Sequence, residues 1–147
     1  MIHVAASPDP LSLAVSYRAR FDECGAGGFL RSSGYLRWAQ DCAWIHSERL
    51  GFNRDWYATH GLWWLVRCAE LTIVGDIPMG DTVSVITTIV AYRRVWARRR
   101  TEVVRSTGER LATALTDWVL TDERGAPTRV PDEFVALFGS RIGRAHV

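Results

Sequence analysis

Hydrophobic and polar residues alternate over much of this chain, which is the pattern of β-strands buried on one face. The first such segment runs from Leu13 to Phe21 and places Val15, Tyr17 and Ala19 on the same face as Phe21. Four longer segments are rich in β-branched and aromatic residues, and turn-forming sequences such as PMGD, STGE and ERGAP separate them. These segments span residues 62–74, 82–92, 95–106 and 110–122. The pattern predicts five strands, the last four in a meander.

The segment between the first two predicted strands has helical periodicity instead. Glycines at 25, 27 and 28 interrupt the first strand, and either Ser32 or Ser33 can cap a helix that continues to about Leu50. Gly51 then provides a stop. One stripe of this helix carries Tyr35, Ala39, Cys42, Ala43, His46 and Leu50. A short helix is also expected at PDEFVALF, near the C-terminus.

One long helix cannot cover both faces of so extensive a sheet. The economical arrangement is α+β: a five- or six-stranded antiparallel sheet wrapped around one long central helix, which is the hotdog fold. We expect a flexible leader at residues 1–12, a single hotdog domain at 13–138 and a C-terminal tail at 139–147. Because a single sheet leaves an edge open, we also expect a homodimer or homotetramer.

Composition narrows the function without deciding it. The chain has 147 residues, of which 48% are hydrophobic and 23% charged, as in one ordinary folded domain. The formal charge of +2 gives no argument for nucleic-acid binding, and no targeting segment or membrane-spanning run is expected. The three cysteines are scattered, which favours a reduced, cytoplasmic protein without a metal or other cofactor.

Four stretches give the chain a family resemblance. They are ECGAGG at 23–28, HSERLGF at 46–52, LWWLVRCAELTIVGDIPMGDTVSVIT at 62–87 and RLATALTDWVLTDERGAPTRVP at 110–131. In this order and spacing, the chain resembles the N-terminal hotdog half of the plant-type acyl-ACP thioesterases. GYLRW at 34–38 is also similar to the helix start of hydroxybenzoyl-CoA thioesterases and of enediyne polyketide thioesterases. The resemblance implies an enzyme that hydrolyses a fatty or polyketide acyl thioester of acyl carrier protein or coenzyme A.

The catalytic residues of these groups do not carry over directly. The loop aspartate of the hydroxybenzoyl-CoA group aligns with Gly25, and the helix arginine of the enediyne group aligns with Ala43. A second hotdog group has an acid about two turns into the helix, where this chain has Gln40. The plant-type enzymes have catalytic residues assigned to a second hotdog half, which has no counterpart here. Two alternatives to hydrolysis therefore stay open: a dehydratase or cyclase acting on a carrier-bound chain, and a non-catalytic acyl-binding subunit.

Two features beside the glycine cluster are candidates for thioester chemistry, which needs a group that activates water and donors for the oxyanion. Strand alternation sends Asp22 and Glu23 to opposite sides, and Glu23 is the better candidate because the resemblance keeps a glutamate there. The alternative is a solvated acid that closes a turn, because an acid before a glycine-rich break is usually structural. The backbone N–H groups of Ser32 and Ser33, at the helix start, would polarise the thioester carbonyl.

The helix itself offers Gln40 and Asp41 as catalytic candidates. Gln40 can orient a water molecule but cannot take its proton at neutral pH. Asp41 either reaches the site of a partner subunit or forms a surface ion pair with Arg37, four residues earlier. His46 lies on the apolar stripe, and we interpret it as a hydrogen-bonded, half-buried histidine rather than a base.

Candidates for substrate and carrier binding are five arginines and two tryptophans: Arg93, Arg94, Arg98, Arg99, Arg100, Trp63 and Trp64. The arginines would attract the phosphates of coenzyme A or an acidic carrier protein. They are also explained as a charged strand edge that resists aggregation. The tryptophans fit either an acyl pocket or the core.

Overall fold

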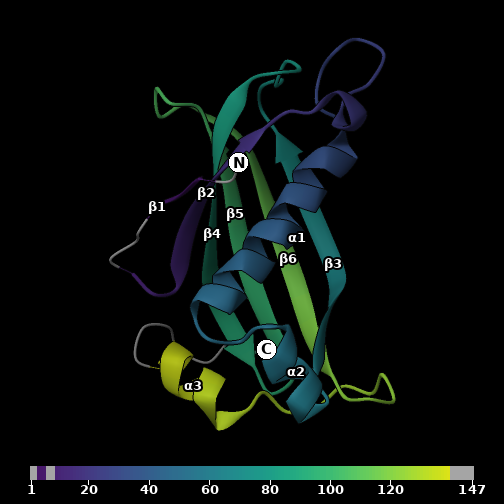
Figure 1. Ribbon diagram of the computed structural model, residues 1–147, viewed down its shortest axis with the longest axis vertical. Helices are drawn as coiled ribbons and strands as arrows, with labels where there is room; N and C mark the ends of the chain where they lie inside the picture. The colour runs from purple at the N-terminus through teal and green to yellow at the C-terminus, as the bar shows by residue number, and fades with distance from the viewer. Residues whose placement is uncertain (1–2, 6–8, 140–147) are drawn as a thin grey trace.

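The structure is a computed structural model that describes residues 3–5 and 9–139 of the chain. Six antiparallel strands form one sheet in the order β1-β2-β4-β5-β6-β3. The strands are β1 His3–Ala5, β2 Ser12–Arg18, β3 Trp63–Ile73, β4 Thr82–Arg93, β5 Trp96–Val104 and β6 Arg110–Thr121. The helices are α1 Ser32–Arg49, α2 Arg54–His60 and α3 Asp132–Gly139, with a short 3-10 turn, η1, at Phe21–Glu23. Figure 1 shows α1 lying diagonally across one face of the sheet, with α2 and α3 near its C-terminal end. The predicted α+β fold is confirmed. The predicted meander of the last four strands is wrong for β3, because β4, β5 and β6 pair in sequence but β3 pairs with β6 and not with β4.

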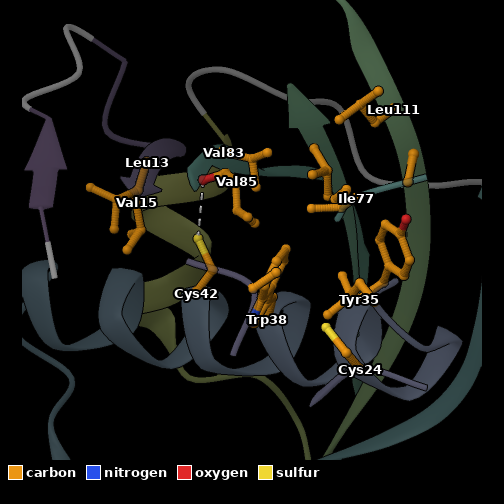
Figure 2. Close-up of a cluster of buried hydrophobic side chains, with 14 residues drawn as sticks. Leu13, Val15, Cys24, Tyr35, Trp38, Cys42, Ile77, Val83, Val85 and Leu111 are labelled. Carbon is orange, nitrogen blue, oxygen red and sulfur yellow. Dashed lines mark hydrogen bonds between the residues drawn. The ribbon is translucent and has the colours of Figure 1, made fainter. Parts of the chain in front are cut away.

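The buried stripe of α1 holds the helix against the sheet. All its predicted members are buried except Leu50, which is partly exposed. Figure 2 shows Trp38 and Cys42 of α1 facing the apolar side chains of β2 and β4. The Cys42 thiol donates a hydrogen bond to the Val85 carbonyl oxygen at 3.6 Å, and burial raises the pKa of this thiol to about 12. Cys42 is therefore an inert core residue, as the sequence predicted.

Two local predictions near the start of the domain are wrong. β2 ends at Arg18, and Phe21 lies in η1 with 81% of its surface exposed. The strand stops because the next residue is tied to the turn before β4: the Ala19 N–H donates to the Asp81 carbonyl oxygen, and the Gly80 N–H donates to that of Ala19. The N-cap residue of α1 is Arg31, and no side chain caps this helix.

The structure contains two elements that the alternation pattern missed. α2 is short, and its ends are fixed by Asn53, whose Oδ1 accepts a hydrogen bond from the Trp56 N–H at 2.9 Å, and by Gly61 at φ 63°. β1 falls inside the segment predicted as a leader and pairs with β2. Residues 140–147, which belong to the predicted tail, lie outside the described residues.

Candidate active site

A cavity of about 340 Å³ lies between the C-terminal half of α1 and the sheet, and residues of α2 and α3 contribute to its wall. This volume is near the lower end of the range for small-molecule sites, about 300–1,000 Å³. The wall consists of Gln40, Ala43, Trp44, Ser47, Leu50, Phe52, Tyr57, Trp63, Trp64, Leu65, Val66, Ile89, Ala97, Arg99, Trp118, Phe134 and Phe138. Eight of these residues are aromatic, so the cavity suits an apolar group.

Three polar side chains in this wall satisfy one another. The Trp64 Nε1–H donates to the Tyr57 hydroxyl at 2.9 Å, and the Ser47 hydroxyl donates to the Phe52 carbonyl oxygen at 2.8 Å. The Tyr57 and Ser47 hydroxyl oxygens are 2.8 Å apart. Because Ser47 has already used its proton, the Tyr57 hydroxyl donates to Ser47. The chain of hydrogen bonds joins β3, α2 and α1, and it places Trp64, one of the two predicted tryptophans, in the cavity wall.

Arg99 is the one charged residue in the wall formed by the described residues. It reaches inward from β5 with 9% of its surface exposed, and its Nη1 donates to Thr87 Oγ1 at 3.1 Å and to His46 Nδ1 at 2.9 Å. Since Nδ1 accepts, the proton of the neutral imidazole lies on Nε2, which donates to the Pro10 carbonyl oxygen at 2.7 Å. His46 is therefore hydrogen-bonded on both nitrogens, and it is more deeply buried than the sequence suggested.

Near neutral pH the His46 imidazole is uncharged and the Arg99 guanidinium is positively charged. Burial, with a further contribution from Arg99, lowers the pKa of His46 to about 4, so the imidazole is neutral. Burial also lowers the pKa of Arg99, to about 10, which still leaves the guanidinium protonated. The cavity wall thus carries a buried positive charge held by a neutral histidine.

Glu23 and Asp22 lie away from this cavity. Glu23 Oε1 accepts a hydrogen bond from the Arg20 N–H at 3.1 Å, and its Oε2 accepts one from Trp38 Nε1 at 3.0 Å. Asp22 forms a surface ion pair with Arg20 at 2.7 Å. One carboxylate oxygen of Glu23 thus closes its own turn and the other holds the loop against α1, an arrangement that favours the structural explanation of this residue.

The start of α1 has free backbone donors. Ser32 and Ser33 are exposed, and their N–H groups have no acceptor within the described residues; the first bond of this turn is donated by the Gly34 N–H to the Arg31 carbonyl oxygen at 2.8 Å. Gly34 allows the loop to close, since a Cβ there would lie 2.4 Å from the Leu30 side chain. Gln40 lies eight residues beyond Ser32 along α1, or about 12 Å at a rise of about 1.5 Å per residue.

Gln40 and Asp41 have different surroundings although they are adjacent on α1. Gln40 is exposed, lines the cavity, and has no hydrogen-bond partner within the part of the chain that the structure describes. Asp41 Oδ2 accepts a hydrogen bond from the Tyr17 hydroxyl at 2.6 Å. The predicted ion pair between Asp41 and Arg37 is not found among the described residues, because Asp41 turns toward β2 instead.

The five arginines do not act as one patch. Arg93 and Arg94 are exposed at the turn between β4 and β5. On β5, Arg98 forms a double hydrogen bond with Asp117, at 2.8 and 3.2 Å, and Arg100 pairs with Glu102 at 3.2 Å. Strand alternation points Arg99 to the opposite face, into the cavity wall. Trp63 also lines the cavity, from the edge strand β3.

Two further findings concern the described residues as a whole. Their side chains include no group of three or more His, Cys, Asp or Glu arranged to hold a metal ion. None of their helices combines the length and apolar character needed to cross a membrane.

An antiparallel sheet wrapped around one helix, with an aromatic-lined cavity between them, defines a hotdog protein that can enclose an apolar group. Residues 10–138 match the family model described as the acyl-ACP thioesterase N-terminal domain. The chain therefore belongs to the acyl-ACP thioesterase family, and the fold and family predicted from its sequence are confirmed. No functionally curated protein matches the sequence significantly.

Solved structures with the same fold include three that cover most of this chain. A putative oleoyl thioesterase from Lactobacillus plantarum has a TM-score of 0.84 and 20% identity over 92% of this chain and 54% of its own. This chain thus spans about half the length of that protein. DHNA-CoA thioesterase from Staphylococcus aureus has a TM-score of 0.80 and 19% identity over 88% of this chain and 89% of its own. A Staphylococcus aureus protein solved in complex with CoA has a TM-score of 0.80 and 10% identity, over 91% of this chain and 86% of its own.

Proposed function

We propose that this protein is a cytoplasmic thioesterase that hydrolyses an acyl thioester of acyl carrier protein or coenzyme A. The observation that carries this proposal is the open cavity beside Gln40, rich in aromatic residues, in a chain of the acyl-ACP thioesterase family. Structures of the same fold include a DHNA-CoA thioesterase and a protein in complex with CoA, which supports a thioester substrate. The cysteines are free thiols, as expected for a reducing compartment.

In the proposed reaction, a water oxygen attacks the thioester carbonyl carbon and the C–S bond breaks. The products are a carboxylic acid and the thiol of the carrier, with one water consumed. Gln40 orients the water, and the free N–H groups of Ser32 and Ser33 stabilise the oxyanion. Since these donors lie about 12 Å from Gln40 along one helix, they reach the same carbonyl only if they come from a second subunit.

A non-catalytic, acyl-binding subunit is the second candidate, because the cavity wall formed by the described residues contains no Asp, Glu or His. The two functions are separated by incubating the protein with acyl-CoA and acyl-ACP thioesters from four to sixteen carbons and measuring free thiol. Hydrolysis above the buffer rate at one or more chain lengths supports the thioesterase. Saturable binding of the same thioesters without release of thiol would select the acyl-binding subunit.

Replacing Gln40 tests the water-orienting role. We expect Gln40→Ala to lower kcat by about 10- to 100-fold with little change in stability, because the side chain is exposed and misplaced water reacts slowly. Gln40→Glu should retain or raise kcat, and the rate should increase with pH as the carboxylate ionises. Arg37→Ala, one turn earlier and also exposed, is the matched control and should leave kcat unchanged. Equal kcat in the wild type and Gln40→Ala would remove Gln40 from the mechanism.

We further propose that the protein forms a homodimer or homotetramer through β3. This strand pairs only with β6 among the described strands, and it carries the exposed apolar side chains Trp63, Leu65 and Ile73. A long edge strand with exposed apolar residues favours association with another strand. We expect Ile73→Arg to shift the protein to a monomer, measured by light scattering after size-exclusion chromatography, while Val135→Arg on α3 leaves the assembly unchanged. Wild-type protein that is monomeric at the same concentration would contradict the proposal.

A further inference from the structure

Arg99, the charged residue in the cavity wall, has no acidic partner among the described residues. The ion pairs of this part of the chain involve Arg20, Arg98, Arg100 and Arg105. All the acids in these pairs are at least partly exposed, and none of them pairs with Arg99. Removing a guanidinium from water without a counter-charge is unfavourable, so a ligand that supplies a negative charge would gain by binding here.

The hydrogen bonds of Arg99 leave one edge of its guanidinium free. Both of its bonds are donated by Nη1, to His46 and to Thr87. Nε and Nη2 form another edge of the planar group and have no acceptor in the described part of the protein. Among the described residues, only one side-chain N or O atom is both fully buried and without a hydrogen-bond partner, and it is the Thr101 hydroxyl oxygen. Nε and Nη2 of Arg99 also lack a partner, so they are not fully buried. They are accessible, and Arg99 forms part of the cavity wall.

The position of this edge is fixed by the groups behind it. Thr87 and His46 are themselves buried, and His46 can only accept at Nδ1 while its Nε2–H is bonded to Pro10. Two acceptors from two different elements, β4 and α1, therefore hold Nη1 in place. A guanidinium held in this way loses little conformational freedom when a ligand binds, which favours a geometrically specific contact.

We propose that the acyl group of the substrate carries a carboxylate, which binds as a bidentate partner to Nε and Nη2 of Arg99. The substrate class is then the monothioester of a dicarboxylic acid, with the aromatic wall enclosing the carbon chain between the two ends. This inference rests on the proposed thioester hydrolysis and adds the identity of the acyl group. Tyr57, Ser47 and Trp64 already satisfy one another, so Arg99 is the wall residue that selects for charge.

Two thioesters of equal length test this proposal: octanoyl-CoA and suberoyl-CoA, the mono-CoA thioester of octanedioic acid. We expect wild-type kcat/KM to be about 10- to 100-fold higher for suberoyl-CoA, as a charged hydrogen-bonded pair provides. Arg99→Met should lower kcat/KM for suberoyl-CoA by a similar factor, and its kcat/KM for octanoyl-CoA should equal or exceed that of the wild type. Arg99→Lys keeps the charge but not the two-donor edge, so its kcat/KM for suberoyl-CoA should lie between those of the wild type and Arg99→Met. Arg110 on β6 is exposed and forms no ion pair with another described residue, so Arg110→Gln is the control and should match the wild type.

Three kinetic outcomes would overturn the inference. The first is a wild-type enzyme that prefers octanoyl-CoA, and the second is one that hydrolyses 8-hydroxyoctanoyl-CoA as well as suberoyl-CoA, because a neutral oxygen would then suffice. The third is an Arg99→Met variant that loses both substrates equally while circular dichroism shows it folded. Arg99 would then serve the fold and not the choice of substrate.

A binding measurement separates this inference from the proposed hydrolysis. Monomethyl suberate has one ester and one carboxylate, whereas dimethyl suberate has the same chain and no charge. Calorimetry should show wild-type protein binding the half-ester about 10- to 100-fold more tightly than the diester, and Arg99→Met should abolish the difference. If no thioester is hydrolysed but this preference is found, the carboxylate site stands and the hydrolase proposal fails. If thioesters are hydrolysed but the half-ester binds no more tightly than the diester, the hydrolase proposal stands and the carboxylate site fails.

Discussion

We expect Ala43→Phe to lower kcat/KM for octanoyl-CoA by at least about 100-fold while the protein remains folded. Ala43 lies on the buried face of α1 and forms part of the cavity wall, so a benzyl group at this position occupies space that the acyl chain needs. Each buried methylene contributes about 0.8 kcal/mol, and excluding most of an octanoyl chain removes several of these contributions. Filling an apolar cavity with an apolar ring also tends to leave stability unchanged or to raise it.

The control for this experiment is Ala136→Phe, which adds the same group on the exposed side of α3. It should keep the wild-type kcat/KM. Butyryl-CoA provides a second control, since a short chain needs less of the cavity and should lose less activity in Ala43→Phe. A variant that hydrolyses octanoyl-CoA at the wild-type rate would show that the acyl chain binds elsewhere, even if the protein is a thioesterase.

The sheet and α1 could be predicted because their signals are local and repeat over many residues. Alternation over 82–92 and 110–122 places almost every side chain on a definite face, and the stripe from Tyr35 to His46 repeats over three turns of helix. Phe21 shows where this reasoning fails. Its alternation continues past the end of β2, but the partner strand β4 begins at Thr82, so no further ladder is available to it.

α2 has weak periodicity because it contains only seven residues, yet local signals for it exist. Asn53 is a good N-cap and Gly61 a good C-cap, and they bracket a segment of helical length. Recognising these caps would have identified a helix between α1 and β3. It would also have brought Tyr57 to attention as a residue able to face the cavity.

The site residues also differ in whether a local sequence pattern could predict their positions. Alternation alone separates Arg99 from Arg98 and Arg100 and groups it with Ala97, which also lines the cavity. The contact between Arg99 and His46 could not be predicted, because it joins residues 53 positions apart through the packing of α1 on the sheet. The structural role of Glu23 could not be predicted for a related reason. Its carboxylate accepts a hydrogen bond from Trp38, fifteen residues later on α1, and only the fold brings that helix next to the loop.

The second large effect concerns stability and pH. We expect the free energy of unfolding to fall by about 2 kcal/mol between pH 7.5 and pH 5 because of His46 alone. Burial lowers the pKa of His46 to about 4 in the folded protein, whereas an unfolded histidine has a pKa of about 6.5. Between these values the unfolded chain binds more protons than the folded one, so the His46 contribution is fully present above pH 6.5 and is lost as the pH falls toward 4. The full loss approaches about 3 kcal/mol near pH 4.

His46→Gln isolates this contribution, because an amide can accept from Arg99 and donate to the Pro10 carbonyl oxygen without titrating. Urea unfolding followed by tryptophan fluorescence, at one protein concentration and at pH 5, 6 and 7.5, measures both proteins. The carboxylates, including Asp9 near the imidazole, are common to the two proteins, so the difference between the curves reports His46. We expect the wild type to lose about 2 kcal/mol more than His46→Gln over this range. If the free energies of unfolding of the two proteins changed equally with pH, protonation of His46 would have no cost. The interpretation that a neutral imidazole holds Arg99 in the cavity wall would then be wrong.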